Sequence, residues 1–343
     1  MSNRAPFVSI LVPAYNAARY LPEFCESVRA QTYPHFEVLI ANDGSTDDTV
    51  SVVTPFLKDD RFRLLGWQQN RGLNQAWATL CSLAGGEYWC SPGADDVLYP
   101  LYLERRVATL EANPQAVLVQ GPPELIDEHG ALPIRGPLPL TLPGELKAPR
   151  SLAVLLQHNI IAQPSTLIRT SLTRQVLPFF SCNWIFSPGW YFWILHAATG
   201  SDLLWEPEVL FKYRVHSTSL GVAPEKDSIR RAEIALTPLC ALSVAARFLS
   251  WAAEAWLRWR STLYQRWLLR VVKLQLKGGA KKEWLQLAAA AFYGNNRSHV
   301  ALTAELARHA PGICLTRLRE QAALRTQRFP VSGVAQVNDP VFQ

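Results

Sequence analysis

The chain has 343 residues, of which 49% are hydrophobic and 18% are charged, so it is long enough for two domains and can bury a core. This composition excludes a disordered or fibrous protein. The net charge of +6 is unevenly divided: residues 1–227 carry 17 Lys and Arg against 22 Asp and Glu, whereas residues 228–343 carry 17 against 6. We therefore expect an acidic domain over residues 1–227 and a basic helical region over 228–328 to face different partners, followed by a tail over 329–343.

The first 120 residues alternate between short apolar runs and segments with helical spacing. Strands are expected at Phe7–Val12, Phe36–Ala41, Arg61–Gly66 and Glu87–Ser91, and helices at Arg19–Gln31, Thr46–Leu57, Gly72–Ala84 and Tyr99–Ala112. The second helix should be capped by Ser45 or Thr46. The alternation predicts an α/β fold with a mostly parallel sheet flanked by helices. Right-handed crossovers place the strand-to-helix loops at one edge of such a sheet, where ligands bind.

After a further strand at Val117–Gln120 the pattern changes. Residues 130–149 hold five prolines and are expected to form a surface loop or lid. Helices are then expected at Arg150–Gln157 and Trp190–Thr199, and a strand at Val209–Val215, before the chain becomes almost wholly helical from Ser228. We expect the tail to be ordered only where it docks on the rest of the protein.

The six cysteines lie far apart, and none forms a C-x-x-C pair, which argues against a zinc site or a secreted disulfide framework. The N-terminal residues contain no hydrophobic signal-peptide core, and no window of 18 uncharged apolar residues occurs. The sequence therefore predicts a cytoplasmic protein with reduced thiols.

Three polar motifs follow predicted strands on the ligand edge. They are Pro13-Ala14-Tyr15-Asn16, Asn42-Asp43-Gly44-Ser45 and Gly93-Ala94-Asp95-Asp96. Each alone also suits a turn or a helix cap, but three on one edge favour a ligand site. The adjacent carboxylates of Asp95 and Asp96 repel each other, and the usual remedies are a bound Mg²⁺ or Mn²⁺, or a raised pKa. A divalent ion completes its shell with water and phosphate oxygens, so the motifs indicate a phosphorylated, nucleotide-like ligand.

The segments 8–16, 36–47, 70–74 and 86–96, with 160–169 and 209–216 further on, resemble the family-2 glycosyltransferases of GT-A fold. The resemblance implies transfer of a sugar, with inversion, from a nucleotide diphosphate donor, with a UDP-sugar favoured, aided by Mg²⁺ or Mn²⁺. It also implies a glycan or lipid-linked acceptor, in cell-surface polysaccharide or glycolipid synthesis.

The resemblance also assigns roles by position. It implies nucleotide-sugar binding by Pro13, Ala14, Tyr15, Asn16, Asp43, Asn70, Arg71, Gly72 and Asp95, contacts to the diphosphate or the acceptor by Arg214 and His216, and metal binding by Asp95 with Asp96 beside it.

The chain departs from the family pattern at three positions. Asn42 replaces the first of two paired aspartates, and Gly93 stands in the first acidic position of the D-x-D motif. The family also places its general base four or five residues before a helical Trp, which here is Trp193, yet no Asp or Glu occurs between Arg174 and Asp202.

Three explanations of the absent base stay open. In the first, another residue takes its place, with Asp202, His158 and His196 as candidates, although the helix direction favours packing for His196. In the second, the reaction needs little base assistance. In the alternative interpretation the chain is a catalytically degenerate glycosyltransferase-like protein that binds a nucleotide sugar or a partner without turnover.

Residues 252–274 form a predicted amphipathic helix with Trp on its apolar face and a strong excess of Lys and Arg. Such a helix either packs on the first domain or binds an anionic membrane surface, and the charge favours the membrane. A peripheral position on the inner face of the membrane would follow. No nucleic-acid-binding motif accompanies the basic residues, so we expect no nucleic-acid partner.

Overall fold

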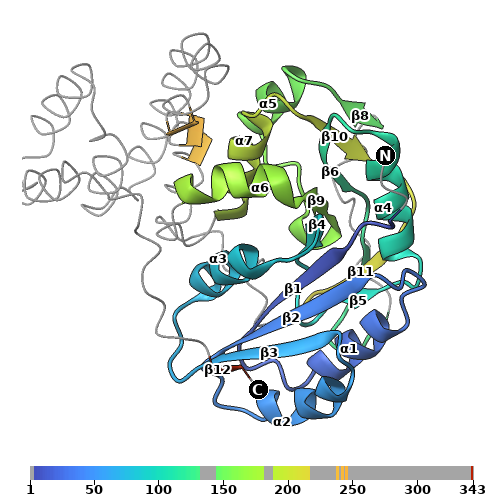
Figure 1. The fold of residues 1–343 in the computed structure, drawn as a ribbon, viewed down its shortest axis with the longest axis vertical. Coiled ribbons are helices and arrows are strands. Elements are labelled where there is room, and N and C mark those ends of the chain that lie inside the picture. Colours follow the sequence, from blue (N-terminus) through green and yellow to red (C-terminus); the bar gives the residue numbers. More distant parts are fainter. Residues whose placement is uncertain are drawn as a thin grey trace, which may run out of the picture. The chain divides into compact units, whose positions relative to one another are not determined.

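The computed structural model describes residues 4–131, 144–180, 188–216, 237–238, 241–242, 244–245 and 341–342 (Figure 1). The chain forms two compact units, the first comprising residues 1–183, 188–223 and 340–343 and the second residues 184–187 and 224–339. In the second unit the described residues are helical, and the predicted basic helix over 252–274 lies outside the described part. No helix within the described residues is long and apolar enough to cross a membrane.

The first unit is built on a nine-stranded sheet with the order β12-β3-β2-β1-β4-β9-β6-β10-β8. Six strands run in one direction, whereas β8, β9 and β12 are antiparallel to their neighbours. The mostly parallel sheet is therefore confirmed. The strands are β1 (Val8–Ala14), β2 (Phe36–Asp43), β3 (Phe62–Trp67), β4 (Tyr88–Cys90), β6 (Ala116–Gln120), β8 (Glu145–Leu146), β9 (Leu167–Arg169), β10 (Asp202–Trp205) and β12 (Val341–Phe342).

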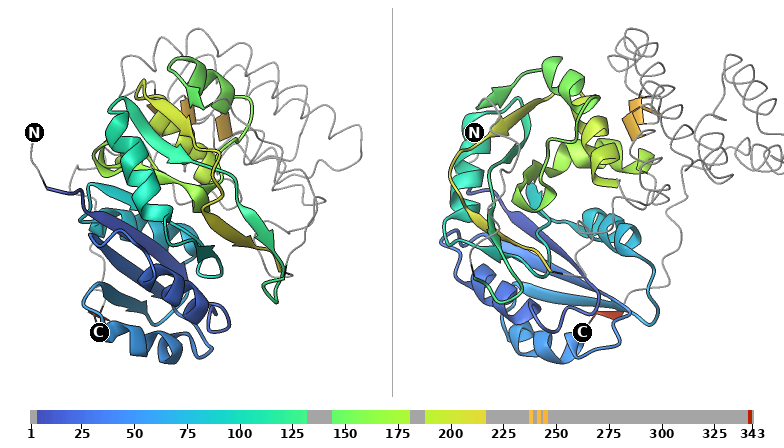
Figure 2. Two further views of the ribbon diagram at one scale, coloured as in Figure 1. Left: turned by 90° about the vertical axis from the view of Figure 1, so that its right-hand side faces the viewer. Right: turned by 180° about the vertical axis from the view of Figure 1, so that it is seen from behind.

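Helices cover both faces of this sheet, as Figures 1 and 2 show. Beside β1–β3, helices α1 and α2 lie on one face and α3 on the other; beside β6 and β9, α4 lies across the sheet from α6 and α7. The helices are α1 (Leu21–Arg29), α2 (Thr49–Val53), α3 (Leu73–Leu83), α4 (Tyr102–Ala112), α5 (Arg150–Leu155), α6 (Thr170–Val176) and α7 (Pro188–Ala197), with 3-10 helices η1 (Thr54–Lys58), η2 (Gln163–Ser165) and η3 (Leu177–Phe179).

A second sheet of three strands, in the order β5-β11-β7, positions one side of the candidate site. Strand β11 (Phe211–Arg214) is antiparallel to β5 (Val97–Leu98) and parallel to β7 (Glu124–Ile126). Because Lys212 is opposite Val97, the end of β11 runs past the residues just before β5. Strand β11, which lies more than 100 residues after Asp95 and Asp96 in the sequence, thereby reaches this predicted acidic motif.

The second predicted helix differs from the observed one in two ways. It is divided into α2 and the 3-10 helix η1, because Pro55 cannot donate the backbone hydrogen bond that an α-helix requires. The predicted cap is also wrong: the residue before α2 is Asp48, while Ser45 and Thr46 bond to Asn16 in the neighbouring loop.

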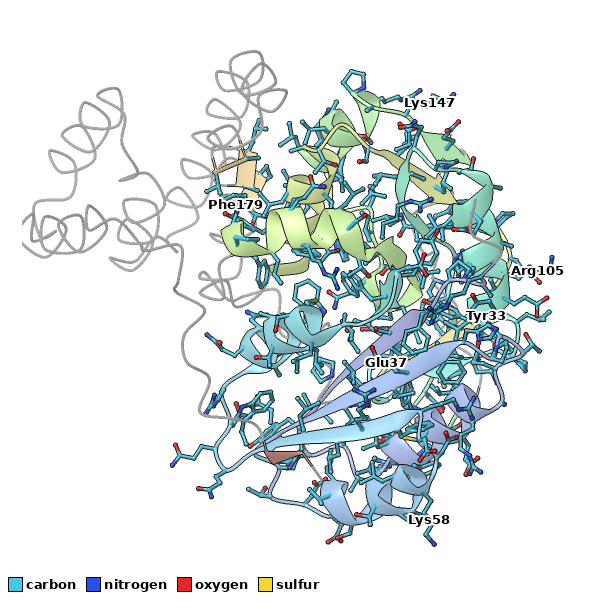
Figure 3. All side chains as sticks on the ribbon, in the orientation of Figure 1. Tyr33, Glu37, Lys58, Arg105, Lys147 and Phe179 are labelled. Carbon is cyan, nitrogen blue, oxygen red and sulfur yellow. The ribbon has the colours of Figure 1, made fainter. Side chains whose placement is uncertain are left out.

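A buried carboxylate, Glu37, lies at the amino-terminal edge of the sheet, opposite the edge where the ligand is expected. Glu37, labelled in Figure 3, is 4% exposed and accepts hydrogen bonds from Ser9 Oγ (2.7 Å) and from the backbone N–H of Gly85 (2.9 Å). Arg63 lies 3.6 Å from its second oxygen. Buried carboxylates need such partners, so Glu37 is satisfied by the structure.

Cysteine usage agrees with the expected reduced thiols over the described residues. Cys25, Cys81 and Cys90 are buried and free. Burial raises the pKa of Cys25 to about 12, so its thiol stays protonated at neutral pH.

Candidate functional site

The loops after β1 and β2 are joined to each other by hydrogen bonds. The backbone N–H of Asn16 donates to Ser45 Oγ (3.0 Å), and Asn16 Oδ1 accepts from the N–H of Thr46 (2.8 Å). Asn16 has a φ of 49°, a left-handed conformation that Asn tolerates better than most residues. Asn16 thus holds the two loops together. Beside it the Tyr15 side chain is 50% exposed, as a ring that stacks on a ligand would need to be.

Pro13 and Ala14 are the last residues of β1 and pair with Ala41 and Asn42 of β2. Ala14 is 1% exposed, and Asn42 Oδ1 accepts from the backbone N–H of Ser45 (3.1 Å). Asn at position 42 therefore keeps the turn-forming hydrogen bond that an aspartate would make.

Asp43 orders the loop between β3 and α3. Its two carboxylate oxygens accept from the backbone N–H groups of Arg71 (2.7 Å) and Gly72 (2.8 Å), and the residue is 2% exposed. Gly44 has a φ of +67°, and a Cβ there would lie 2.6 Å from Asn70 N, so the close approach of the two loops requires glycine. The structure brings together Asp43, Asn70, Arg71 and Gly72, which the sequence assigned to one pocket.

Asp95 and Asp96 have different environments although they are adjacent. Asp96 is 1% exposed, and its oxygens accept from the backbone N–H groups of Gly93 (2.8 Å) and Arg214 (3.1 Å). Burial, and then the charge of Asp95, raises the pKa of Asp96 well above its ordinary value. Both carboxylate oxygens of Asp96, a predicted metal ligand, therefore already accept hydrogen bonds from backbone N–H groups. Asp95 is partly exposed, with 32% of its side chain accessible.

Arg214 joins four segments through its side chain. Its Nε donates to Asp95 O (2.8 Å), its Nη1 to Asp127 O (3.1 Å) and its Nη2 to Glu23 Oε2 (2.6 Å). The side chain is 2% exposed. In this arrangement Arg214 holds the acidic loop in place, and its expected contact to the diphosphate or the acceptor stays a prediction.

His216 extends the same cluster to the surface of the site. Its Nε2 lies 2.8 Å from Asp95 Oδ2, and its ring stacks on Tyr20 with centroids 5.2 Å apart. The guanidinium of Arg214 lies over the same Tyr20 ring at 4.8 Å. The partners Tyr20, Glu23 and Asp127 were not predicted, because they come from unrelated segments and carry no motif of their own.

His196 is placed in the core. It is fully buried, with Nε2 3.0 Å from Thr173 Oγ1 and Nδ1 3.0 Å from Phe192 O. Burial lowers the pKa of His196 to about 4. Its two ring nitrogens are thus engaged by the protein, and no substrate atom can reach them without local opening.

Asp202 and His158, the other two candidates for a base, lie in different segments of the chain. Asp202 begins β10 opposite Ala116, the first residue of β6, so it lies at the amino-terminal edge, away from the motifs. Its Oδ1 accepts from the backbone N–H of Ala148 (2.8 Å). His158 is exposed and precedes the segment in which Gln120 at the carboxyl end of β6 bonds Ile160 and Ala162. Of the three candidates for a base, His158 alone is exposed.

The residues around Asp95 fit a divalent ion only as a partial shell. Within the described residues, no group of three or more His, Cys, Asp or Glu side chains could hold a metal ion. Asp95 Oδ1 has no protein donor in the described part of the chain, and His216 lies beside the other oxygen. One carboxylate is sufficient for an Mg²⁺-like ion whose remaining ligands are water and phosphate oxygens. The fit therefore depends on a phosphorylated ligand.

Comparison with known proteins identifies relatives of the first unit. Residues 9–157 match the model of the family described as Glycosyl transferase family 2. An uncharacterized glycosyltransferase of Haemophilus influenzae is 28% identical over 214 residues, 62% of this chain and 66% of that protein. One from Rickettsia prowazekii is 30% identical over 216 residues, 62% of this chain and 65% of that protein. The matches thus span just under two thirds of both relatives.

The fold has solved counterparts. S. aureus TarS 1–349 in complex with UDP-GlcNAc superposes with a TM-score of 0.57 at 16% identity, over 86% of this chain and 83% of that one. The same protein in complex with UDP gives a TM-score of 0.54 at 18% identity, over 84% and 79%. Identities this low establish the fold alone. The catalytically degenerate alternative is not favoured by these matches. Residues 9–157 are therefore similar to glycosyltransferase family 2, and the first unit has the GT-A fold.

Proposed function

We propose that this protein transfers a sugar, with inversion, from a nucleotide diphosphate donor to a hydroxyl of a glycan or lipid-linked acceptor. The observation that carries the proposal is the convergence of the exposed Tyr15, the Asp43-ordered loop and the partly exposed Asp95 on one edge of the sheet. TarS, which shares the fold, binds UDP and UDP-GlcNAc, and this supports a UDP-sugar as the first donor to test.

In this proposal the residues along the sheet edge have separate roles. Tyr15 stacks on the base, and the loop that Asp43 orders borders the nucleotide. Arg214 holds the backbone of the acidic loop so that Asp95 faces the diphosphate. Mg²⁺ or Mn²⁺, when bound, would offset the negative charge that develops on the departing diphosphate.

Donor binding tests the proposal directly. We expect UDP-sugar binding, measured by calorimetry, to require Mg²⁺ or Mn²⁺ and to weaken at least about tenfold in Asp95→Ala. Asp60→Ala removes the same charge from an exposed position just before β3, at the opposite edge, and should bind like the original protein. Metal-independent binding that is equal in all three proteins would contradict the proposal.

Turnover and location need separate assays. Transfer of sugar above background hydrolysis, with the opposite anomeric configuration in the product, would exclude a binding protein without activity. We further propose a role in cell-surface polysaccharide or glycolipid synthesis at the inner face of the membrane, with residues 252–274 as the contact. Co-sedimentation with anionic liposomes should be lost when this segment is deleted; equal co-sedimentation would contradict the membrane contact.

A further inference from the structure

With the donor bound as proposed above, the strand order leaves room for the acceptor on the side of Asp95 away from the nucleotide. The nucleotide cluster belongs to β1, β2 and β3, Asp95 follows β4, and the next strands in the sheet are β9 and β6. A donor with its base near Asp43 and its diphosphate near Asp95 points its sugar toward β9 and β6. This step rests on the function proposed above.

Gln163 lies on that side. It begins η2 and lies four residues before Leu167, the first residue of β9. Because β9 is antiparallel to β4, with Ile168 opposite Trp89, the residues before β9 lie beside those that follow β4 toward Asp95. The backbone there is fixed, since Tyr102 Oη donates to Thr166 O (3.1 Å).

The side-chain amide of Gln163 is half-buried and has no hydrogen-bonding partner among the described residues. Gly189, at the start of α7, faces it: a Cβ at Gly189 would lie 3.2 Å from Gln163 Oε1 and 3.4 Å from Trp193 Nε1. Any side chain at this position would press on the amide. The amide is accessible to solvent, so a ligand hydroxyl can replace a water molecule as its hydrogen-bonding partner.

We propose that Gln163 is an acceptor-positioning residue, whose Oε1 accepts a hydrogen bond from the attacking sugar hydroxyl beside Gly189. The hydroxyl oxygen forms the new bond to the anomeric carbon, and the bond from that carbon to the diphosphate oxygen breaks. The diphosphate leaves with the electron pair. The hydroxyl proton passes to water, because an amide oxygen is too weak a base to keep it.

The substitution Gln163→Glu replaces this acceptor by a base of the same size. The assay is the release of UDP from a UDP-sugar without acceptor, with Mn²⁺ present, so that water takes the place of the sugar hydroxyl. General-base assistance is worth roughly 10²–10⁴-fold, and we expect a rise in hydrolysis of at least about tenfold. The rate should increase with pH and level off once the introduced carboxylate is ionised.

Two further variants separate positioning from unspecific effects. Gln115→Glu adds the same charge at an exposed position just before β6, at the amino-terminal edge, and should leave the rate and its pH profile unchanged. Gly189→Ala places a methyl group against the Gln163 amide and should lower hydrolysis at least about threefold without changing donor affinity.

The outcomes are distinguishable by calorimetry with the same UDP-sugars. If donors bind but hydrolysis in Gln163→Glu keeps the original rate and pH profile, the role of Gln163 is refuted and the proposed function stands. If Gln163→Glu does not fold, an unchanged rate in Gly189→Ala refutes it equally. If no nucleotide sugar binds, the proposed function fails and this inference fails with it.

Discussion

Acidification should destabilise the protein through His196, because the folded state holds this imidazole in its neutral form. Phe192 O can only accept a hydrogen bond, so Nδ1 carries the proton, and Nε2 accepts from the Thr173 hydroxyl, which in turn accepts from Trp89 Nε1 (2.8 Å). Protonation of Nε2 would reverse the Thr173 bond and leave a buried charge. This arrangement agrees with a pKa lowered to about 4 by burial.

The size of the effect follows from linkage. With an unfolded-state pKa of about 6.5, the unfolded chain takes up the proton first, so the free energy of unfolding falls as the pH falls below about 6.5 and levels off below about 4. The difference between the two pKa values corresponds to about 3 kcal/mol in full, and to about 2 kcal/mol at pH 5.

Urea unfolding of the original protein and of His196→Gln, at pH 7.5 and pH 5, measures this contribution. The variant keeps a polar side chain that does not titrate, so comparison of the two pH dependences isolates the imidazole. We expect the original protein to lose about 2 kcal/mol more than the variant between the two pH values. Parallel pH dependences would refute the reasoning. We also expect His196→Gln to retain donor hydrolysis, whereas a catalytic base at this position would abolish it.

Two other substitutions test the loops of the candidate site. Asp43→Asn places an NH₂ group against one of the two backbone N–H donors at Arg71 and Gly72, and should cost about 2 kcal/mol of unfolding free energy and weaken nucleotide binding, measured by urea unfolding and calorimetry. Binding equal to that of the original protein would contradict the role given to this loop. Gly93→Asp restores the first acid of the family motif but should weaken Mn²⁺-dependent nucleotide binding, because its Cβ would lie 2.3 Å from Asp95 Oδ1. Tighter binding would show that the loop readily accepts the acid.

The sequence predicted those parts of the fold that depend on local patterns. The first four strands and their helices have the expected order, since buried parallel strands read as apolar runs. The short strands β5, β7, β8, β9 and β10 were not predicted, because segments of two to four residues give no clear periodicity. The hydrogen bond between the Arg214 backbone N–H and Asp96 could not be predicted either. It depends on the pairing of β11 with β5, which no spacing along the chain reveals.

The two glycines at acidic positions of the family pattern show why a comparison by position describes this site incompletely. Gly93 lacks the carboxylate that the family pattern has at this position. The carboxylates of Asp95 and Asp96 occupy the space of the absent side chain, and Asp96 accepts a hydrogen bond from the Gly93 N–H. At Gly189 the space faces the unpaired amide of Gln163. In both cases neighbouring groups lie close to the place of the missing side chain, so returning an acid at Gly93 would displace Asp95, whereas near Gly189 a base is better introduced at Gln163, whose amide lies beside the glycine.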